Sequence, residues 1–430
     1  MKKVAEKKRI VWIDQLRAIA FYFVGLGHLN SYYGPLNVWI YSFHMPMFFL
    51  ISGLNLNITK IYNTKFKDYF LHLVQRMLVP YFWLQLISTG IKYFTFRNEI
   101  SVFKYFLGMF VGNNRIFGAA SNAMYFVLVL FLAQVCFWFV IRGTKANKVH
   151  MCLILAILSF ASFATQNADM PWHLNVVPTG MAFMFIGRLL MDGFVSAEES
   201  LEKIKKPLYF GIGAALLTVG YFLARYNGRI SIHANSYGKN YLVFLLAAVI
   251  SFAGFAFIIM KIPSVRLLSF IGKNTLFFLG IHEPFLVLVR DIFPQFWGKW
   301  WFIAVASVVC YLLPVPVAWL FNRFAPYVCG IPPKQSGLPF KIGKYVTVAL
   351  SFAACYISFL ILFFDGVLIK NGIMKFVCAI SYAAVVFGIE RLFSLVLPFF
   401  FLQSKKKQPP AEADTYTDDG VTVIIPVEEV

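Results

Sequence analysis

The sequence predicts an all-α fold, a polytopic bundle of transmembrane helices, and two observations carry that prediction. First, 60% of the 430 residues are hydrophobic and only 13% are charged, whereas soluble globular domains carry about 25% charged residues. Second, apolar runs of the length that crosses a bilayer, roughly 20 residues per helix, recur along most of the chain. The net charge of +20 arises mainly in short loops between these runs, which excludes a soluble nucleic-acid-binding domain.

About twelve crossings are expected from the apolar periodicity, with ten or eleven as alternatives. We expect these helices near residues 10–30, 38–56, 70–94, 120–142, 149–166, 173–191, 208–225, 241–260, 267–289, 299–321, 345–364 and 373–402. The stretch 102–112 is too short to span a bilayer, so we expect an interfacial or re-entrant segment there.

The distribution of basic residues predicts the side on which each loop lies. If the N-terminus is inside, the inner loops carry most of the lysines and arginines, for example Lys203, Lys205 and Lys206. The outer loops 30–38 and 166–172 contain neither residue type. Because basic loops are retained on the cytoplasmic side, both termini are expected in the cytoplasm, which requires an even number of crossings.

The chain divides into three parts by composition. Residues 1–325 form the expected membrane core, and residues 326–403 are expected to add further transmembrane helices. Residues 404–430 are polar, acidic and proline-containing, which is typical of a disordered cytoplasmic tail. The six cysteines show no C-x-x-C spacing and are expected to be packing residues.

The first expected helix carries three ionisable residues, Asp14, Arg17 and His28, in an otherwise apolar span. Arg17 and His28 are eleven residues apart, which is three helical turns plus roughly 20° and a rise of about 16 Å. They therefore share one face, and Asp14 can pair with Arg17 from three residues away. Ionisable groups within a membrane are costly and usually functional. The alternative is an ion pair at the inner interface with an interfacial histidine at the outer one.

The second expected helix contains “FHMPMFFLISG”, residues 43–53. It starts from the outer side, so His44 should lie at a depth close to that of His28, with Ser52 toward the inner end. Pro46 can loosen the helix and expose backbone carbonyls to a cavity. His44 is either functional or a hydrogen-bonded interfacial histidine.

Further segments follow in order: “QRMLVPYF” (75–82), “AMYFVLVLF” (123–131), “FMFIGRLL” (183–190) and “IGKNTLFFLGIH” (271–282). Together with “RIVWIDQLRAIAFYFVGLGH” and “FHMPMFFLISG”, they resemble the acyltransferase-3 family of integral-membrane acyltransferases, and within it the branch described as fucose 4-O-acetylase-like. The resemblance covers about residues 9–325. Two departures stand out. Arg76 alone matches a pair of basic residues common at the family's third helix, with His72 as a partial substitute, and Tyr125 stands where tryptophan is usual.

The resemblance implies an integral-membrane O-acyltransferase, an enzyme that transfers groups other than aminoacyl groups. Such proteins move an acyl group, usually acetyl, from cytoplasmic acetyl-CoA or another acyl-CoA to a hydroxyl of an extracytoplasmic glycan. It also implies a multi-pass protein of the bacterial cytoplasmic (plasma) membrane that modifies cell-envelope polysaccharide. The expected partners are membrane lipids and a hydroxyl-bearing acceptor, and nothing in the sequence indicates an oligomeric state.

Within that resemblance, His28 is the expected catalytic residue, either as general base on the acceptor hydroxyl or as a transient acyl carrier. Arg17 and Arg76 are expected to bind the CoA phosphates, because guanidinium groups suit phosphate oxygens. Asp14 is expected to be a structural partner of Arg17, and any residue that orients His28 must come from another helix. The candidate substrate-binding residues are His44, Ser52, His282 and Glu283.

Several other functions are weighed against this one. His, Asp and Glu do not cluster along the chain at metal-ligand spacing, so no metal is expected. His150, His173 and His233 lie in or next to loops without a motif and are expected to be solvated. The alternative function is a transporter or flippase for a glycan or lipid-linked sugar, in which the same polar stripe would line a pathway; no internal repeat supports it.

Overall fold

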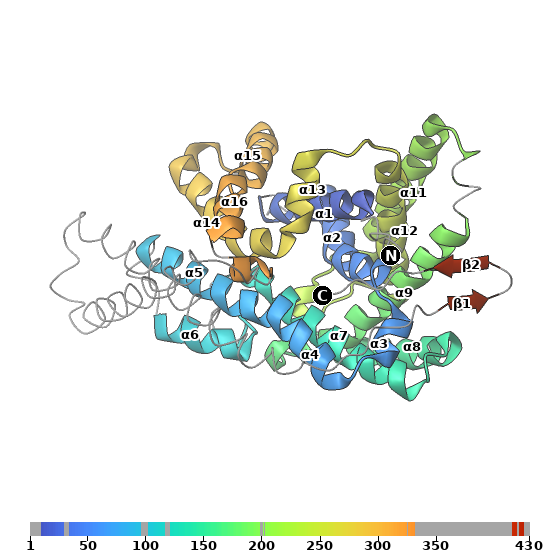
Figure 1. The fold of residues 1–430 in the computed structure, drawn as a ribbon. Coiled ribbons are helices and arrows are strands. Elements are labelled where there is room, and N and C mark those ends of the chain that lie inside the picture. The colour runs from blue at the N-terminus through green and yellow to red at the C-terminus, as the bar shows by residue number, and fades with distance from the viewer. Residues whose placement is uncertain are drawn as a thin grey trace.

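The computed structural model describes residues 10–29, 34–95, 102–116, 121–197, 201, 203–324, 326–331, 415–418 and 421–424. The expected helices at 345–364 and 373–402 lie outside the described residues. Up to residue 331 the described chain is built from helices (Figure 1), which confirms the predicted all-α class. Two short strands, β1 (Thr415–Asp418) and β2 (Val421–Ile424), pair antiparallel in the C-terminal segment.

The helices come in the following order along the chain. They are α1 (Val11–Leu29), α2 (Pro35–Leu54), α3 (Ile58–Asn63), α4 (Phe66–Leu73), α5 (Val79–Thr95), α6 (Val102–Val111), α7 (Tyr125–Gly143), α8 (Lys148–Ala164), α9 (Val177–Ser196), α11 (Lys206–Asn227), α12 (Tyr241–Met260), α13 (Arg266–Lys273), α14 (Thr275–Ile292), α15 (Trp300–Leu312) and α16 (Val315–Phe324). Short turns of 3₁₀ or π type complete them: η1 (Val74–Leu78), η2 (Asn122–Met124), η3 (Pro171–Val176), η4 (Ile232–Ala234), η5 (Pro294–Phe296) and η6 (Pro326–Cys329).

Five described helical segments are long and apolar enough to cross a membrane, as a multi-pass membrane protein requires. They are Asn122–Gly143, Pro171–Ser196, Lys206–Asn227, Tyr241–Met260 and Trp300–Arg323. The predicted total of about twelve crossings and the cytoplasmic placement of both termini stay predictions.

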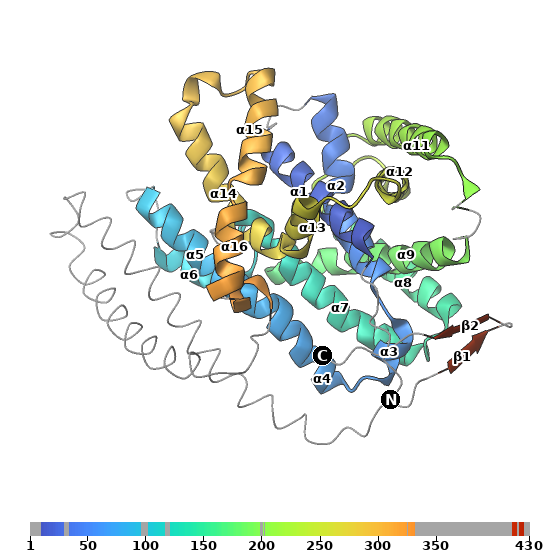
Figure 2. The ribbon, with the colours of Figure 1, turned by 45° about the horizontal axis from the view of Figure 1, so that its top comes forward.

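Helices α1 and α2 lie in the middle of the bundle, with α14–α16 on one side, α11 and α12 on the other and α7–α9 below them in the view (Figure 2). Two of the contacts around this pair depend on glycine. A Cβ on Gly272 of α13 would overlap the backbone of Asp14 in α1, and a Cβ on Gly187 of α9 would overlap the carbonyl of Leu50 in α2. These backbone-to-backbone contacts hold the two central helices in fixed positions, as small residues do at membrane helix interfaces.

The third expected crossing is a continuous helical path, α4–η1–α5, with a π turn at its centre. Pro80 explains the turn, because proline lacks an N–H and its ring clashes with the carbonyl four residues earlier, here that of Arg76. Gly330, with a φ of 72°, packs against that same carbonyl, where a Cβ would lie 2.8 Å from the oxygen. The segment after α16 therefore covers the turn that carries Arg76.

Two expected helices are each divided in the structure. The stretch 267–289 is broken between α13 and α14 at Asn274, whose side-chain Nδ2 donates to the Phe270 carbonyl at 2.9 Å. The stretch 299–321 is broken between α15 and α16 at Pro314, which cannot continue a helix. Helix α14 therefore begins as a separate helix after Asn274, and it packs against both α1 and α5.

Candidate active site

The polar face of α1 ends at His28, which is the penultimate residue of the helix and is exposed. Three turns earlier, Arg17 lies on the same face with 28% of its side chain exposed, and its Nη1 is 3.4 Å from Asp14 Oδ1. Asp14 is buried against α13. The face thus carries an ion pair at one end and an exposed imidazole at the other.

Helix α14 brings His282 and Glu283 to His28. The ring centroids of His28 and His282 are 5.3 Å apart, and one ligand-capable atom from each of the three residues lies within 4.8 Å of the other two. His28 also interacts electrostatically with His44 of α2. Two ionisable side chains of α14 therefore lie next to His28, and their role in orienting its ring stays a prediction.

The orientation of His282 is set by its backbone contact. Its Nδ1 is 2.9 Å from the carbonyl oxygen of Leu279, and a carbonyl oxygen only accepts, so Nδ1 carries the proton. In the neutral ring Nε2 then holds the lone pair, and this buried atom has no hydrogen-bond partner among the described residues. The edge of Phe21 packs against the ring at a centroid distance of 5.8 Å. His282 therefore holds a buried nitrogen whose lone pair has no hydrogen-bond partner among the described residues.

Glu283 is held by a different set of contacts. Its Oε1 accepts hydrogen bonds from the backbone N–H groups of Asn122 at 2.8 Å and Ala123 at 3.1 Å. These are the first two residues of η2, so the carboxylate interacts with the partly positive start of the helix that leads into α7. Glu283 is only 8% exposed, and these bonds compensate for part of the cost of burying its charge.

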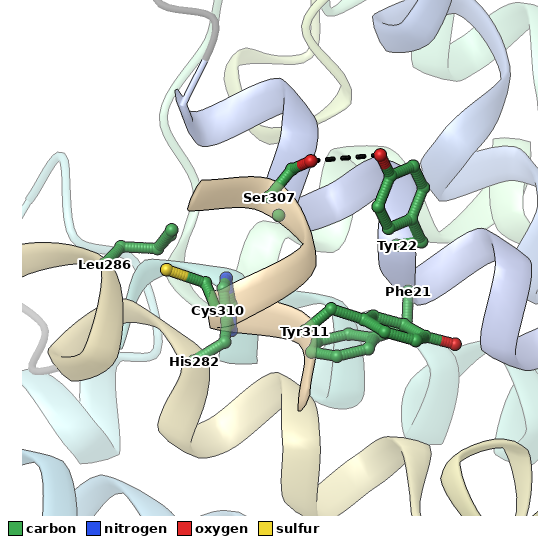
Figure 3. Close-up of a pocket in the computed structure, with 8 residues that line it drawn as sticks. Phe21, Tyr22, His282, Leu286, Ser307, Cys310 and Tyr311 are labelled. Carbon is green, nitrogen blue, oxygen red and sulfur yellow. Dashed lines mark hydrogen bonds between the residues drawn. The ribbon is translucent and has the colours of Figure 1, made fainter. Parts of the chain in front are cut away.

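A mostly apolar pocket lies between α1, α14 and α15, one turn before His28 on α1. Its lining residues are Phe21, Tyr22, Gly25, His282, Leu286, Ser307, Cys310 and Tyr311. Figure 3 shows His282 and Leu286 of α14 near Cys310 of α15, with Phe21 stacked against Tyr311. Tyr22 and Ser307 join across it through their hydroxyls at 3.0 Å. The cavity volume is about 10 Å³, roughly the room that one water molecule needs, so the lining side chains nearly fill the pocket.

A second, polar pocket lies beyond Glu283, at the η2 end of α7. It is lined by Tyr81, Gln85, Gly112, Asn114, Ser121, Asn122 and Tyr125. Hydrogen bonds organise its wall: Asn114 Nδ2 donates to Asn122 Oδ1 at 2.6 Å, and Gln85 Oε1 accepts from the Ser121 N–H at 3.1 Å. Its side chains are uncharged and carry several amide and hydroxyl groups, which suits a neutral, hydroxyl-rich molecule.

A histidine in the loop between α11 and α12 extends this wall. His233 of η4 donates a hydrogen bond from Nε2 to Asn114 Oδ1. Burial and the charge of Arg115 lower the pKa of His233 to about 4, although the charges of Asp169 and Glu283 partly oppose this, so its ring is neutral at pH 7. The rings of His173 and Tyr125 both pack on it, with centroids 5.0 Å and 4.9 Å away.

Other candidate residues lie elsewhere. His44 is buried, with Nδ1 2.8 Å from the carbonyl of Ile40 and its ring against Tyr41 at 5.0 Å. Ser52 donates back to the Phe48 carbonyl at 2.8 Å, two turns further along α2 than His44. Arg76 is exposed on the π turn. Of the predicted residues, His282 and Glu283 lie next to His28, each with an atom within 4.8 Å of it.

The expectation that His173 is solvated is wrong, because it is 2% exposed. His233 is also partly buried, whereas His150 is exposed as expected. Asn114 and Asn122 were not selected from the sequence either. Nothing in the local sequence distinguishes these residues, since their proximity depends on three separate loops that meet at one end of the bundle.

Residues 10–319 match the sequence model of the acyltransferase-3 family, which is described as an acyltransferase domain. The chain belongs to the acyltransferase-3 family. Membership implies a membrane acyltransferase, and the matched range contains all three residues of the His28–His282–Glu283 cluster. No curated protein and no solved structure matches the chain.

Proposed function

We propose that this acyltransferase transfers an acyl group, acetyl in particular, from cytoplasmic acyl-CoA to a hydroxyl of an extracytoplasmic glycan. The observation that carries the proposal is the meeting of His28, His282 and Glu283 between an apolar pocket and a polar one. Within the family the chain would belong to the fucose 4-O-acetylase-like branch. It would act in the bacterial cytoplasmic membrane and modify a polysaccharide of the cell envelope.

In this proposal His28 is the general base. A ring nitrogen takes the proton of the acceptor hydroxyl while that oxygen attacks the thioester carbonyl. The C–O bond forms, the C–S bond breaks, and the proton passes from the imidazolium to the departing thiolate, which leaves as CoA thiol. Glu283, within 4.8 Å of His28, stabilises the transient imidazolium, and the His282 ring limits the positions that His28 can take.

The apolar pocket is the proposed site of the acyl chain. It lies one helical turn from His28 and reaches His282, so a thioester carbonyl at its mouth would be next to the base. Its small volume favours acetyl over longer chains. The donor's phosphates would lie toward Arg17 and Arg76, because Arg17 is about 16 Å along the α1 axis from His28 and the flexible arm of CoA can span such a distance.

The polar pocket is the proposed site of the acceptor. Its wall continues from Asn114 through Asn122 to the backbone contacts of Glu283, so a sugar bound there would have hydroxyls near His28. Neutral amide and phenol groups bind sugar hydroxyls by hydrogen bonds, and the aromatic faces of Tyr125 and His173 suit the apolar face of a sugar ring. His44 would support this side of the site from α2.

The proposal is tested in cells that express wild-type protein, His28→Ala or the control His150→Ala at equal membrane levels. Mass spectrometry of surface glycans should detect added acetyl groups with wild type and the control, and none with His28→Ala. Purified protein in liposomes that contain labelled acetyl-CoA should transfer label outward to external glycan. An acceptor that crosses the bilayer unmodified without acetyl-CoA would instead indicate the transporter or flippase function and refute the proposal.

A further inference from the structure

We propose that His28, His282 and Glu283 form a binding site for Zn²⁺, and that the bound ion reversibly inhibits the protein. The three residues come from two helices, and their ligand-capable atoms lie within 4.8 Å of one another. The ion here is an inhibitor that competes with acyl transfer, and the transfer reaction itself uses no metal. The binding proposal is independent of the proposed function, and only the inhibition rests on it.

The donor set fits this metal. Zinc binds imidazole nitrogen and carboxylate oxygen at about 2.0–2.2 Å, and two histidines with one glutamate and a water form a common four-coordinate site. Calcium and magnesium prefer all-oxygen sites. Ligand atoms around a tetrahedral zinc lie about 3.4 Å apart, and those of the cluster lie within 4.8 Å of one another, so their separations must shorten by up to about 1.4 Å. His28 is exposed at the end of α1 and can change rotamer without disturbing the core.

The surroundings of the two buried ligands are those that metal ligands require. A metal-bound histidine usually donates its other ring N–H to a carbonyl or carboxylate, which fixes the tautomer. His282 does this through Nδ1 and the Leu279 carbonyl, which leaves Nε2 as the lone-pair donor of the ring. Glu283 is likewise fixed by the two backbone N–H groups that its Oε1 accepts. Both ligands are oriented before any ion arrives.

The His282 nitrogen supplies an independent reason to expect a ligand. Its Nε2 is buried and has no hydrogen-bond partner among the described residues, and a buried polar atom without a partner is costly. A zinc ion would satisfy this atom. It would also occupy the nitrogen of His28 that the acceptor hydroxyl needs as a base, so bound Zn²⁺ and acyl transfer are mutually exclusive.

The test uses the full-length protein, purified in detergent with a histidine-free affinity tag and stripped with a chelator. Titration with Co²⁺, read by visible absorption, and with Zn²⁺, read by equilibrium dialysis and elemental analysis, should give one tightly bound ion per chain. His28→Ala and Glu283→Gln should each weaken binding by more than about 100-fold, beyond the 10–100-fold typical of outer-shell changes. Glu283→Gln keeps an oxygen for the two backbone bonds, and His150→Ala, at an exposed site, should bind as wild type does.

Unchanged binding in His28→Ala and Glu283→Gln, with both variants eluting as folded monodisperse protein, would overturn the proposal. So would wild-type protein that binds no ion at micromolar concentration. Acetyl transfer by wild type should fall as the site fills and should recover with chelator. If wild type transfers no acetyl group under any condition, the proposed function fails, while the Co²⁺ spectra still decide whether the metal site exists.

Discussion

Substituting Glu283 by glutamine or by alanine separates its charge from its hydrogen bonds. Oε1 accepts the N–H groups of Asn122 and Ala123, and a glutamine oxygen can take the same place, whereas alanine leaves both donors without this acceptor. An unsatisfied buried donor costs about 1–3 kcal/mol. Asn122 is exposed and Ala123 is buried, so water replaces one bond. We expect a loss of about 1–3 kcal/mol for alanine and less than about 1 kcal/mol for glutamine.

The charge itself should matter for the reaction. A carboxylate within 4.8 Å of a His28 ring nitrogen attracts an imidazolium by about 3 kcal/mol at an effective dielectric constant of about 20. His28 is exposed, and solvent screening reduces this to about 1.5–3 kcal/mol. Since about 1.4 kcal/mol corresponds to a tenfold change in rate, Glu283→Gln should lower kcat by about 10- to 100-fold.

The assay compares the thermal unfolding midpoint of each purified variant in detergent with its initial rate of acetyl transfer from acetyl-CoA. Glu283→Gln should unfold near the wild-type temperature and react slowly, and Glu283→Ala should be impaired in both measurements. A glutamine variant with the wild-type rate would refute the assigned role of the charge. Equal stability of the two variants would refute the assigned role of the backbone bonds.

Three further predictions concern the helix bundle, the loop that carries His233 and the apolar pocket. Gly187→Ala should destabilise the protein by about 1–3 kcal/mol, because the added Cβ overpacks against a backbone carbonyl of α2. The control Gly193→Ala lies on the same helix, has no atom within 4 Å of its Cβ and should be neutral or stabilising. Equal unfolding midpoints for the two variants would contradict this prediction. Burial lowers the pKa of His233 to about 4, so the folded ring stays neutral while the unfolded ring protonates near pH 6.5. The free energy of unfolding should therefore fall by up to about 2 kcal/mol between pH 7 and pH 5, and His233→Asn should remove that component of the pH dependence. Gly25→Val should narrow the apolar pocket and reduce kcat/KM more for propionyl-CoA than for acetyl-CoA. The control is Gly211→Val, because neither Gly25 nor Gly211 has an atom within 4 Å of its Cβ position. This control should leave the ratio of the two kcat/KM values unchanged.

Most of the described helices were predictable because the bilayer imposes a length and an apolar composition on each span. The expected helix at 241–260 and α12 have the same bounds, and α1 and α2 begin and end within three residues of their expected positions. The breaks at Asn274 and Pro314 were missed, since an apolar run continues across both and periodicity alone does not detect a break. Proline was the available signal at 314, because it cannot continue a helix.

The candidate site was predictable one residue at a time but not as a cluster. Helical geometry places Arg17 and His28 on one face, and it places Asp14 within reach of Arg17. His282 and Glu283 were candidates from the sequence, yet their contact with His28 joins α1 to α14 across more than 250 residues. Local sequence carries no information on such a contact. Only the packing of α14 against α1 brings the residues together.

The hydrogen bonds between α1 and α15 favour an acyltransferase over a transporter. The hydroxyl of Tyr311 donates to the Ala18 carbonyl at 3.1 Å, and the hydroxyls of Tyr22 and Ser307 are hydrogen-bonded at 3.0 Å, so two hydrogen bonds at the apolar pocket join α15 to α1. A transporter with alternating access would have to break these contacts in each cycle to pass a bulky sugar. An acyltransferase needs only to admit a short acyl chain into this pocket, and the two hydrogen bonds between α1 and α15 can stay in place while it does so.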